Sequence, residues 1–160
     1  MIVQPGKGGR GCLAEMMDVY RRTGGNIIAV EEVPPEDAHK FGIVAIGKGK
    51  APLWPIEAMV EKPPKGTAPS NLYIMGRYII QPEIFPLLGT QQAGAGGEIQ
   101  VTDALIALKD KVKQPFYALR HSGRTFDCGS KIGFLAANLA LGLDDKDAGQ
   151  ELKALIAKMM

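Results

Sequence analysis

The sequence predicts an α/β fold with a mixed β-sheet, in which parallel and antiparallel strands occur together. Short apolar runs bounded by glycine and proline alternate with longer segments whose apolar residues recur at helical spacing, as in helices packed on a sheet. The sheet is expected to be mixed because residues 72–80 and the neighbouring strands lack the long crossover that joins parallel strands. A chain of 160 residues, 46% hydrophobic and 22% charged, suffices for one globular domain with a sizeable core.

Strands are expected wherever an apolar run lies between turn residues. The clearest example is Ile27-Ile28-Ala29-Val30, which is apolar on both faces and therefore typical of a buried strand. The expected strands are 26–33, 42–46, 56–60, 72–80, 116–121 and a short one at 124–127.

Helices are expected where apolar residues share one face and a capping residue stands at the end. Residues 13–22 have this pattern, and Gly24-Gly25 end the helix. Thr102 and Ser130 are plausible N-caps of two later helices. The expected helices are 13–22, 82–88, 103–111, 131–143 and 148–160, with a turn or short helix opening at 34–37 and glycine-rich loops at 4–11 and 89–97.

Composition excludes several classes of protein. The net charge of +2 gives no broad basic surface for nucleic acid, and no apolar run approaches the length of a membrane span. The first residues contain no apolar stretch of the kind found in signal peptides. Cys12 and Cys128 are far apart, which indicates free thiols rather than a disulfide or metal site. We therefore expect a cytoplasmic protein without nucleic-acid or membrane partners.

The most informative residues are Glu61 and Lys62, which end a strand just before two prolines. Strand ends are where α/β folds place their ligand contacts. Successive strand residues point to opposite faces, but at a strand end both can reach one ligand. The carboxylate would accept hydrogen bonds from hydroxyls, and the ammonium would contact a phosphate. The alternative is a strand that simply ends in solvated charges.

Two further carboxylates stand at positions that suit a ligand. Asp127 follows a short strand and precedes a glycine turn, where it could hold a divalent cation that also touches a phosphate. Alternatively, it bonds its own backbone in a tight turn. Glu98 follows the glycine-rich loop and could accept a hydrogen bond from a sugar hydroxyl, or could merely favour the dipole of the next helix.

Gly42 and the two histidines have less distinctive surroundings. A glycine that opens a strand, as Gly42 does, lets a ligand or another backbone come close, although a plain turn glycine is the simpler interpretation from this position alone. His39 and His121 stand in no metal-ligand spacing and no nucleophile triad, so both are interpreted as surface or structural residues.

Taken together, seven segments occur in the order seen in bacterial UTP–glucose-1-phosphate uridylyltransferases, and the chain resembles that family from about Leu13 to Met160. Single motifs recur across sugar-nucleotide pyrophosphorylases, whereas Ala-Pro-Ser-Asn, Gly-Glu-Ile-Gln and Asp-Cys-Gly together are specific to the UDP-glucose branch. The segments are Val30-Glu-Glu-Val-Pro-Pro-Glu-Asp37, Phe41-Gly-Ile-Val44, Val60-Glu-Lys-Pro63, Ala68-Pro-Ser-Asn71, Gly76-Arg-Tyr78, Gly97-Glu-Ile-Gln-Val-Thr-Asp-Ala104 and Phe126-Asp-Cys-Gly129.

The resemblance implies a Rossmann-like (GT-A-like) nucleotidyltransferase fold that is incomplete at its N-terminus. Family members begin with a strand and a Gly-x-Gly-Thr-Arg loop that holds UTP, and they carry a later acidic motif that binds magnesium. Neither motif occurs in this sequence. Residues 1–160 thus resemble the C-terminal, sugar-phosphate-binding part of a single nucleotidyltransferase domain. Within it, 1–12 would be a loop and 131–160 the C-terminal helices.

The same resemblance implies roles for individual residues. Glu61 resembles the carboxylate that binds sugar hydroxyls, and Lys62 resembles the catalytic lysine that contacts the phosphate of glucose-1-phosphate. Asp127 resembles a ligand of Mg²⁺, the cofactor of the family. Gly42, the backbone around Ile74, and Glu98 resemble further sugar contacts.

The family reaction is attack of the glucose-1-phosphate phosphate on the α-phosphorus of UTP, which gives UDP-glucose and pyrophosphate. The attacking oxygen is already an anion, so catalysis needs positioning and charge neutralisation rather than a protein nucleophile or base. UTP would bind only with the N-terminal part, so this chain alone is expected to be inactive. The resemblance implies a homo-oligomer when the protein is full length.

Two other functions fit the sequence as well: a non-catalytic sugar-phosphate-binding or interaction module, and an inert truncated product. One expectation about folding accompanies the resemblance. Without the N-terminal part, the run 27–30 is expected to lose neighbouring strands and to leave apolar surface and an unpaired edge. Such a chain would aggregate and bind a hydrophobic dye.

Overall fold

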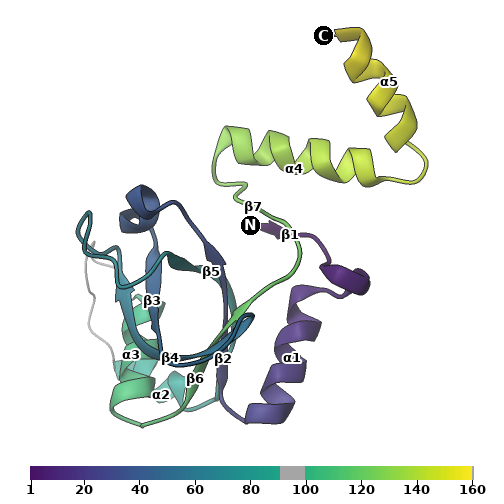
Figure 1. Cartoon of the computed structure of the whole chain (residues 1–160). Helices are drawn as coiled ribbons and strands as arrows, with labels where there is room; N and C mark the ends of the chain where they lie inside the picture. Colours follow the sequence, from purple (N-terminus) through teal and green to yellow (C-terminus); the bar gives the residue numbers. More distant parts are fainter. Residues whose placement is uncertain (91–99, 160) are drawn as a thin grey trace.

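The computed structural model describes residues 1–90 and 100–159. A mixed sheet of five strands closes into a barrel, and helices pack against it (Figure 1). The mixed α/β class predicted from the sequence is therefore confirmed. In barrel order the strands are β2 (Asn26–Glu32), β5 (Leu72–Ile79), β3 (Gly42–Ile46), β4 (Leu53–Glu61) and β6 (Phe116–Arg120).

Closure of the barrel gives β2 a partner on each side. It pairs antiparallel with β5 and parallel with β6, so that Ile27 stands opposite Ile79 in one strand and Tyr117 in the other. The expectation of an unpaired, exposed edge at residues 27–30 is wrong, because all four side chains are fully buried. The parallel β2–β6 pairing supplies the neighbour that the sequence pattern could not reveal.

Three helices cover the two faces of β2. Ile27 and Ala29 pack with α1 (Cys12–Thr23), whereas Ile28 and Val30 pack with a core that includes residues of α2 (Ile84–Thr90) and α3 (Val101–Asp110). Side chains alternate between the faces of a strand, so a strand buried on both sides must be apolar throughout. This explains the uninterrupted apolar run of β2.

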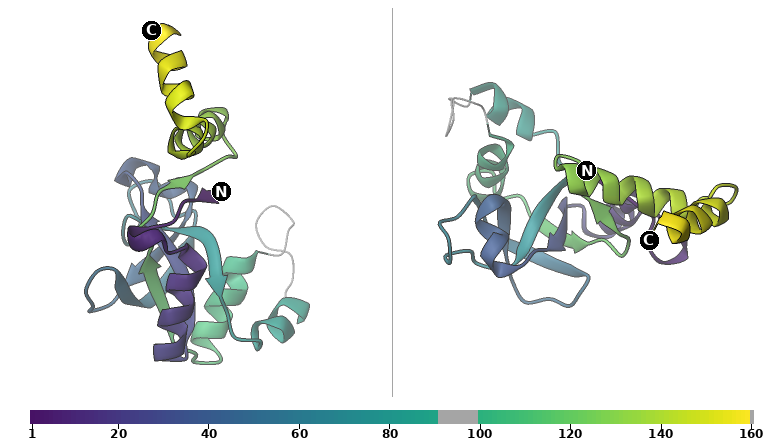
Figure 2. Two further views of the ribbon diagram at one scale, coloured as in Figure 1. Left: turned by 90° about the vertical axis from the view of Figure 1, so that its right-hand side faces the viewer. Right: turned by 90° about the horizontal axis from the view of Figure 1, so that it is seen from above.

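The C-terminal helices form a separate arm, which we define as residues 131–159. It contains α4 (Lys131–Asp144) and α5 (Gly149–Met159), and it projects away from the barrel in all views (Figures 1 and 2). The arm is joined to the barrel through β7 (Thr125–Phe126), which pairs antiparallel with β1 (Ile2–Val3). Ser130 caps α4, as predicted, because its hydroxyl accepts a hydrogen bond from the Gly133 N–H.

Some boundaries differ from the sequence-based expectation. Residues 1–12 are not simply a loop, because they contain β1 and a 3₁₀ helix, η1 (Lys7–Gly9). The turn expected at 34–37 is a longer 3₁₀ helix, η2 (Pro35–Lys40). In the described part of the chain, no helix is long and apolar enough to cross a membrane.

Thr102 is not the N-cap of α3. The helix begins at Val101, and its N-cap residue is Gln100, whose side chain makes no capping hydrogen bond. Thr102 therefore lies in the first turn, and its hydroxyl bonds to a side chain of another element, as described below.

Candidate functional site

A cavity of about 370 Å³ lies where β3, β4 and β5 meet the start of α3. Three of the residues singled out from the sequence, Gly42, Glu61 and Ile74, line it together. They come from three different strands, so the fold gathers residues that are up to 32 positions apart in the sequence (from 42 to 74). The cavity has the size of a small-molecule site.

Glu61 is held at the wall of this cavity by its neighbours. It is the last residue of β4 and stands directly opposite Gly42 in β3. A Cβ atom on Gly42 would lie 2.8 Å from Glu61 Oε2, so only glycine leaves room for the carboxylate in this position. The Thr102 hydroxyl donates a hydrogen bond to the same oxygen at 2.8 Å.

Tyr78 also lines the cavity, and the charge of Glu61 affects its pKa. Burial of the phenol raises the pKa of Tyr78, and the nearby Glu61 carboxylate raises this pKa further. The phenol therefore remains neutral, and its O–H can donate a hydrogen bond within the cavity.

Lys62 lies in an adjacent cavity of about 540 Å³, whose wall also contains Glu61. The chain turns sharply there, because Lys62 has φ = 43°, a left-handed conformation that is costly for a residue with a Cβ atom. Its N–H donates to the Phe41 carbonyl, which anchors the turn to the start of β3. Its side chain is exposed and makes no ion pair within residues 1–90 and 100–159. The ammonium is thus available to an anion.

Asp127 lies apart from Gly42, Glu61, Ile74 and Lys62. It is exposed, follows β7 and lines neither cavity. Its Oδ1 accepts a hydrogen bond from the Gly129 N–H at 3.0 Å, which is the tight-turn geometry left open by the sequence. Among the described residues, no three His, Cys, Asp or Glu side chains are grouped as a metal site. Asp127 thus offers at most one carboxylate to a cation.

Glu98, the remaining predicted contact, lies outside the described residues. Its expected role as a sugar contact therefore stays a prediction.

A polar cluster near Asp127 was missed by sequence reasoning. Glu31 accepts hydrogen bonds from the Tyr73 hydroxyl, at 3.2 Å, and from the Thr125 hydroxyl. Burial, followed by the charge of Glu31, raises the pKa of Tyr73 to about 12. The cluster ties β2, β5 and β7 together. No residue spacing in the sequence predicts this cluster, because its members come from distant segments.

A second missed cluster explains His121. The side chain is almost fully buried, with Nδ1 at 2.6 Å from Glu15 Oε2 and Nε2 at 2.9 Å from the Gln4 carbonyl oxygen. A neutral imidazole has one N–H, so only the protonated ring can donate to both acceptors. Burial opposes ionisation of Glu15, but the hydrogen bonds from His121 and Ser122 lower the pKa of Glu15 overall. Of the two interpretations left open for His121, surface or structural, the buried ring supports the structural one.

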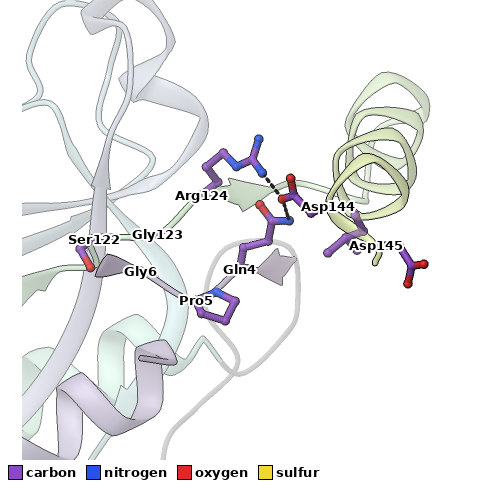
Figure 3. A pocket seen from close by; sticks show the side chains of 9 residues that line it. Gln4, Pro5, Gly6, Ser122, Gly123, Arg124, Asp144 and Asp145 are labelled. Atoms are coloured by element: carbon purple, nitrogen blue, oxygen red, sulfur yellow. Dashed lines mark hydrogen bonds and ion pairs between the residues drawn. The ribbon is translucent and has the colours of Figure 1, made fainter. Parts of the chain in front are cut away.

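A third cavity, of about 500 Å³, lies between the N-terminal segment and the arm (Figure 3). There Asp144, at the end of α4, accepts hydrogen bonds from Arg124 and, at 3.1 Å, from Gln4 Nε2. These contacts join the arm to the barrel. Of the predicted ligand-binding residues that the structure describes, none lines this cavity.

Comparisons with known proteins agree on one family. Residues 10–142 match the family model described as nucleotidyl transferase. The chain is 44% identical over 147 residues to a UTP–glucose-1-phosphate uridylyltransferase of Staphylococcus epidermidis, covering 92% of this chain and 50% of that protein. It is also 44% identical over 140 residues to the Bacillus subtilis protein of the same name, covering 88% of this chain and 47% of that protein.

Solved structures give the same result. The fold matches a UDP-glucose pyrophosphorylase of Acinetobacter baumannii with a TM-score of 0.87 at 37% identity, covering 99% of this chain and 54% of that one. It also matches a UDP-glucose pyrophosphorylase solved in complex with UDP-glucose, with a TM-score of 0.80 at 33% identity. The chain spans about half the length of the curated relatives it matches.

Proposed function

Because the chain belongs to the nucleotidyl transferase family, we propose that it supplies the glucose-1-phosphate-binding part of a UTP–glucose-1-phosphate uridylyltransferase. The observation that carries this proposal is the cavity that gathers Gly42, Glu61 and Ile74, with Lys62 in the adjacent cavity that shares Glu61. These are the residues whose motifs imply contact with a sugar phosphate. Their grouping supports a binding site more than a strand that ends in solvated charges.

Glu61 and Lys62 would recognise different parts of the ligand. Glu61 would accept a hydrogen bond from a sugar hydroxyl, and the free ammonium of Lys62 would meet the phosphate. A unit charge pair about 4 Å apart gains roughly 4 kcal/mol at an effective dielectric near 20, before desolvation is subtracted. Lys62 should therefore contribute strongly to affinity, while Glu61 and Gly42 select the sugar.

In the whole enzyme, a phosphate oxygen of glucose-1-phosphate would form a bond to the α-phosphorus of UTP. The bond from that phosphorus to the bridging oxygen of the β-phosphate would break, and pyrophosphate would leave with its electrons. Lys62 would hold the attacking phosphate in place and offset its charge, so no protein base is required.

The described residues supply only part of the oxygen ligands that a magnesium ion needs. Mg²⁺ is often bound by one or two carboxylates together with substrate phosphates and water, and Asp127 could provide one such oxygen. Bound there, the ion would neutralise phosphate charge. Asp127 would keep its turn with Gly129 through Oδ1, which leaves Oδ2 as the oxygen that could hold the ion.

Uridylyl transfer by these 160 residues alone is not expected, because the sequence has no Gly-x-Gly-Thr-Arg loop to hold UTP. Pyrophosphate release from UTP, glucose-1-phosphate and magnesium is the direct assay. Turnover within tenfold of an intact relative would contradict this part of the proposal.

Binding of glucose-1-phosphate can be tested by calorimetry on the chain itself. Lys62→Ala should weaken binding at least tenfold, and Glu61→Gln should weaken binding of glucose-1-phosphate more than that of inorganic phosphate. Lys153→Ala, on the exposed surface of α5, is the matched control and should bind like the wild type. Equal affinities for Lys62→Ala and the wild type would refute the proposed role of Lys62.

A non-catalytic sugar-phosphate-binding module remains the second candidate. The closed barrel favours this candidate, because the run 27–30 of β2 is already fully buried and does not need further strands to cover it. The two candidates differ in one assay. Fusion to the UTP-binding half of a relative should restore pyrophosphate release if the chain is part of the enzyme, and should not if it is a separate module.

We also propose that the arm mediates self-association with a second copy. Seven large apolar side chains on α4 and α5 are 41–78% exposed: Ile132, Phe134, Leu135, Leu139, Leu141, Leu155 and Met159. A standard interface takes about 800 Å² from each partner, and seven such side chains, each offering on the order of 100 Å², would supply most of it.

The free thiols of Cys12 and Cys128 fit a cytoplasmic location, which stays a prediction.

A further inference from the structure

We propose that Thr102 is a positioning residue for Glu61: it holds one carboxylate oxygen so that the other accepts a hydrogen bond from the sugar. This inference rests on the proposed function, since it refines how the cavity would recognise glucose-1-phosphate. Thr102 itself need not touch the phosphate or the reacting atoms.

The first observation is where the Thr102 hydroxyl points. Thr102 is 8% exposed and lies in the first turn of α3, where a threonine commonly bonds the backbone of its own helix. Here the hydroxyl donates instead to Glu61 Oε2 at 2.8 Å, across to the end of β4. A hydrogen bond to an ionised acceptor is stronger than one between neutral groups, so it can fix the carboxylate.

The second observation is how tightly that oxygen is enclosed. Oε2 lies between the start of α3 and the backbone of Gly42, where a Cβ atom would be only 2.8 Å away. Thr102 therefore holds Oε2 from one side, and the missing side chain of Gly42 makes room on the other. Both residues line the same cavity as Glu61.

The consequence concerns the second oxygen. No side chain or backbone group in the described parts of the chain donates a hydrogen bond to Glu61 Oε1. With Oε2 fixed, Oε1 keeps a constant direction and remains the acceptor for a ligand. Because the carboxylate is already ordered, the ligand does not have to immobilise it, and affinity for the sugar increases.

The residues thus divide the ligand between them. Thr102 acts on the sugar through Glu61, whereas Lys62 meets the phosphate directly. Loss of the Thr102 hydroxyl should therefore weaken binding of glucose-1-phosphate but leave binding of inorganic phosphate unchanged. A general disturbance of the fold would weaken both.

The test compares Thr102→Val, which keeps the shape but removes the hydroxyl, with Thr102→Ser, which keeps the hydroxyl. Titration calorimetry on the 160-residue chain would use glucose-1-phosphate and inorganic phosphate as probes. We expect Thr102→Val to raise the Kd for glucose-1-phosphate about tenfold, as expected for one lost hydrogen bond, and Thr102→Ser to stay within threefold of the wild type. Thr23→Val, whose hydroxyl donates to the Val19 carbonyl and accepts from the Gly25 N–H at the end of α1, is the matched control and should change neither Kd.

A second readout works without any ligand. The ¹³Cδ resonance of Glu61 should move in Thr102→Val and return toward the wild-type position in Thr102→Ser. The inference is overturned if this resonance is unchanged in Thr102→Val, or if Thr102→Val binds glucose-1-phosphate as tightly as the wild type. If the wild type binds no glucose-1-phosphate, the proposed function fails, and the resonance alone still decides whether Thr102 holds Glu61.

Discussion

The barrel and the arm use apolar residues in opposite ways. In β2 the run from Ile27 to Val30 is completely buried, with helices packed toward both faces and other strands on both edges. In α4, by contrast, Ile132 is 76% and Leu135 60% exposed. Both stretches are rich in apolar residues, but only the run in the barrel is buried within the structure.

The difference separates two kinds of function. The candidate sugar-phosphate cavity is built mainly from strands of the barrel and the start of α3, whose positions are set by buried packing. The arm is joined to the barrel through β7 and the contacts of Asp144. Ligand binding should therefore depend on the barrel, and association with a second copy on the arm.

The largest effect should come from deleting a buried side chain of the barrel. Ile28→Ala leaves a cavity in the core and should lower the free energy of unfolding by about 2–5 kcal/mol. Leu135→Ala, on the exposed face of the arm, should change it by no more than about 0.5 kcal/mol. Urea unfolding followed by circular dichroism measures both. Equal losses would mean that the arm is packed as tightly as the barrel.

The next effect concerns the buried pair of Glu15 and His121. Because the folded state lowers the pKa of Glu15 below its ordinary 4.5, ionised Glu15 stabilises the fold above about pH 4.5. This stability is lost as the pH falls through the lower pKa of the folded state. Glu15→Gln should cost about 1.5–3 kcal/mol at pH 7, as expected for a hydrogen bond to a charged group.

Melting temperatures measured between pH 7 and pH 3 provide the check. The gap between wild type and Glu15→Gln should be widest at neutral pH and should narrow in acid. A gap of constant size would show that the charge of Glu15 does not contribute. Glu57→Gln, at an exposed position of β4, serves as the control carboxylate.

A change in association without a change in stability is expected from the arm. The double variant Ile132→Glu/Leu135→Glu should reduce binding of a hydrophobic dye and shift sedimentation toward the monomer, because two exposed apolar side chains become charged. Its midpoint of urea unfolding should stay close to that of the wild type at low protein concentration. A wild-type chain that is monomeric and binds no dye would contradict the proposed interface.

The smallest effect is expected at the joint between the two regions. Arg124→Ala removes an ion pair whose partners are both more than half exposed, and such pairs contribute between about 0 and 1 kcal/mol. The barrel should keep its stability, while amide hydrogen exchange at the start of α4 should become faster. A loss of several kcal/mol would mean that the arm is an integral part of the folded core.

Local patterns in the sequence predicted most of the secondary structure. Gly42–Ile46 matches the expected strand, and Ser130 caps α4, because both depend on residues close in sequence. Barrel closure depends instead on the parallel pairing of β2 with β6, about 90 residues later (from 26 to 116), which no local pattern encodes.

The same limit applies to the site. The motifs identified Gly42, Glu61 and Lys62, because each stands at a strand end with a distinctive neighbour. For Thr102 the sequence predicts only a helix cap, because its bond to Glu61 spans 41 positions and exists only after α3 packs beside β4. Long-range hydrogen bonds of this kind become visible only in the folded molecule.

The most direct test of the barrel as the ligand-binding region is to map glucose-1-phosphate on the chain by ¹H–¹⁵N NMR. Titration should move the amide signals of Gly42 and Thr102 in one cavity and of Lys62 in the adjacent cavity, and leave those of α4 and α5 in place. Signals that move only at the arm, or no movement at saturating ligand, would contradict the assignment of the sugar-phosphate site to the barrel.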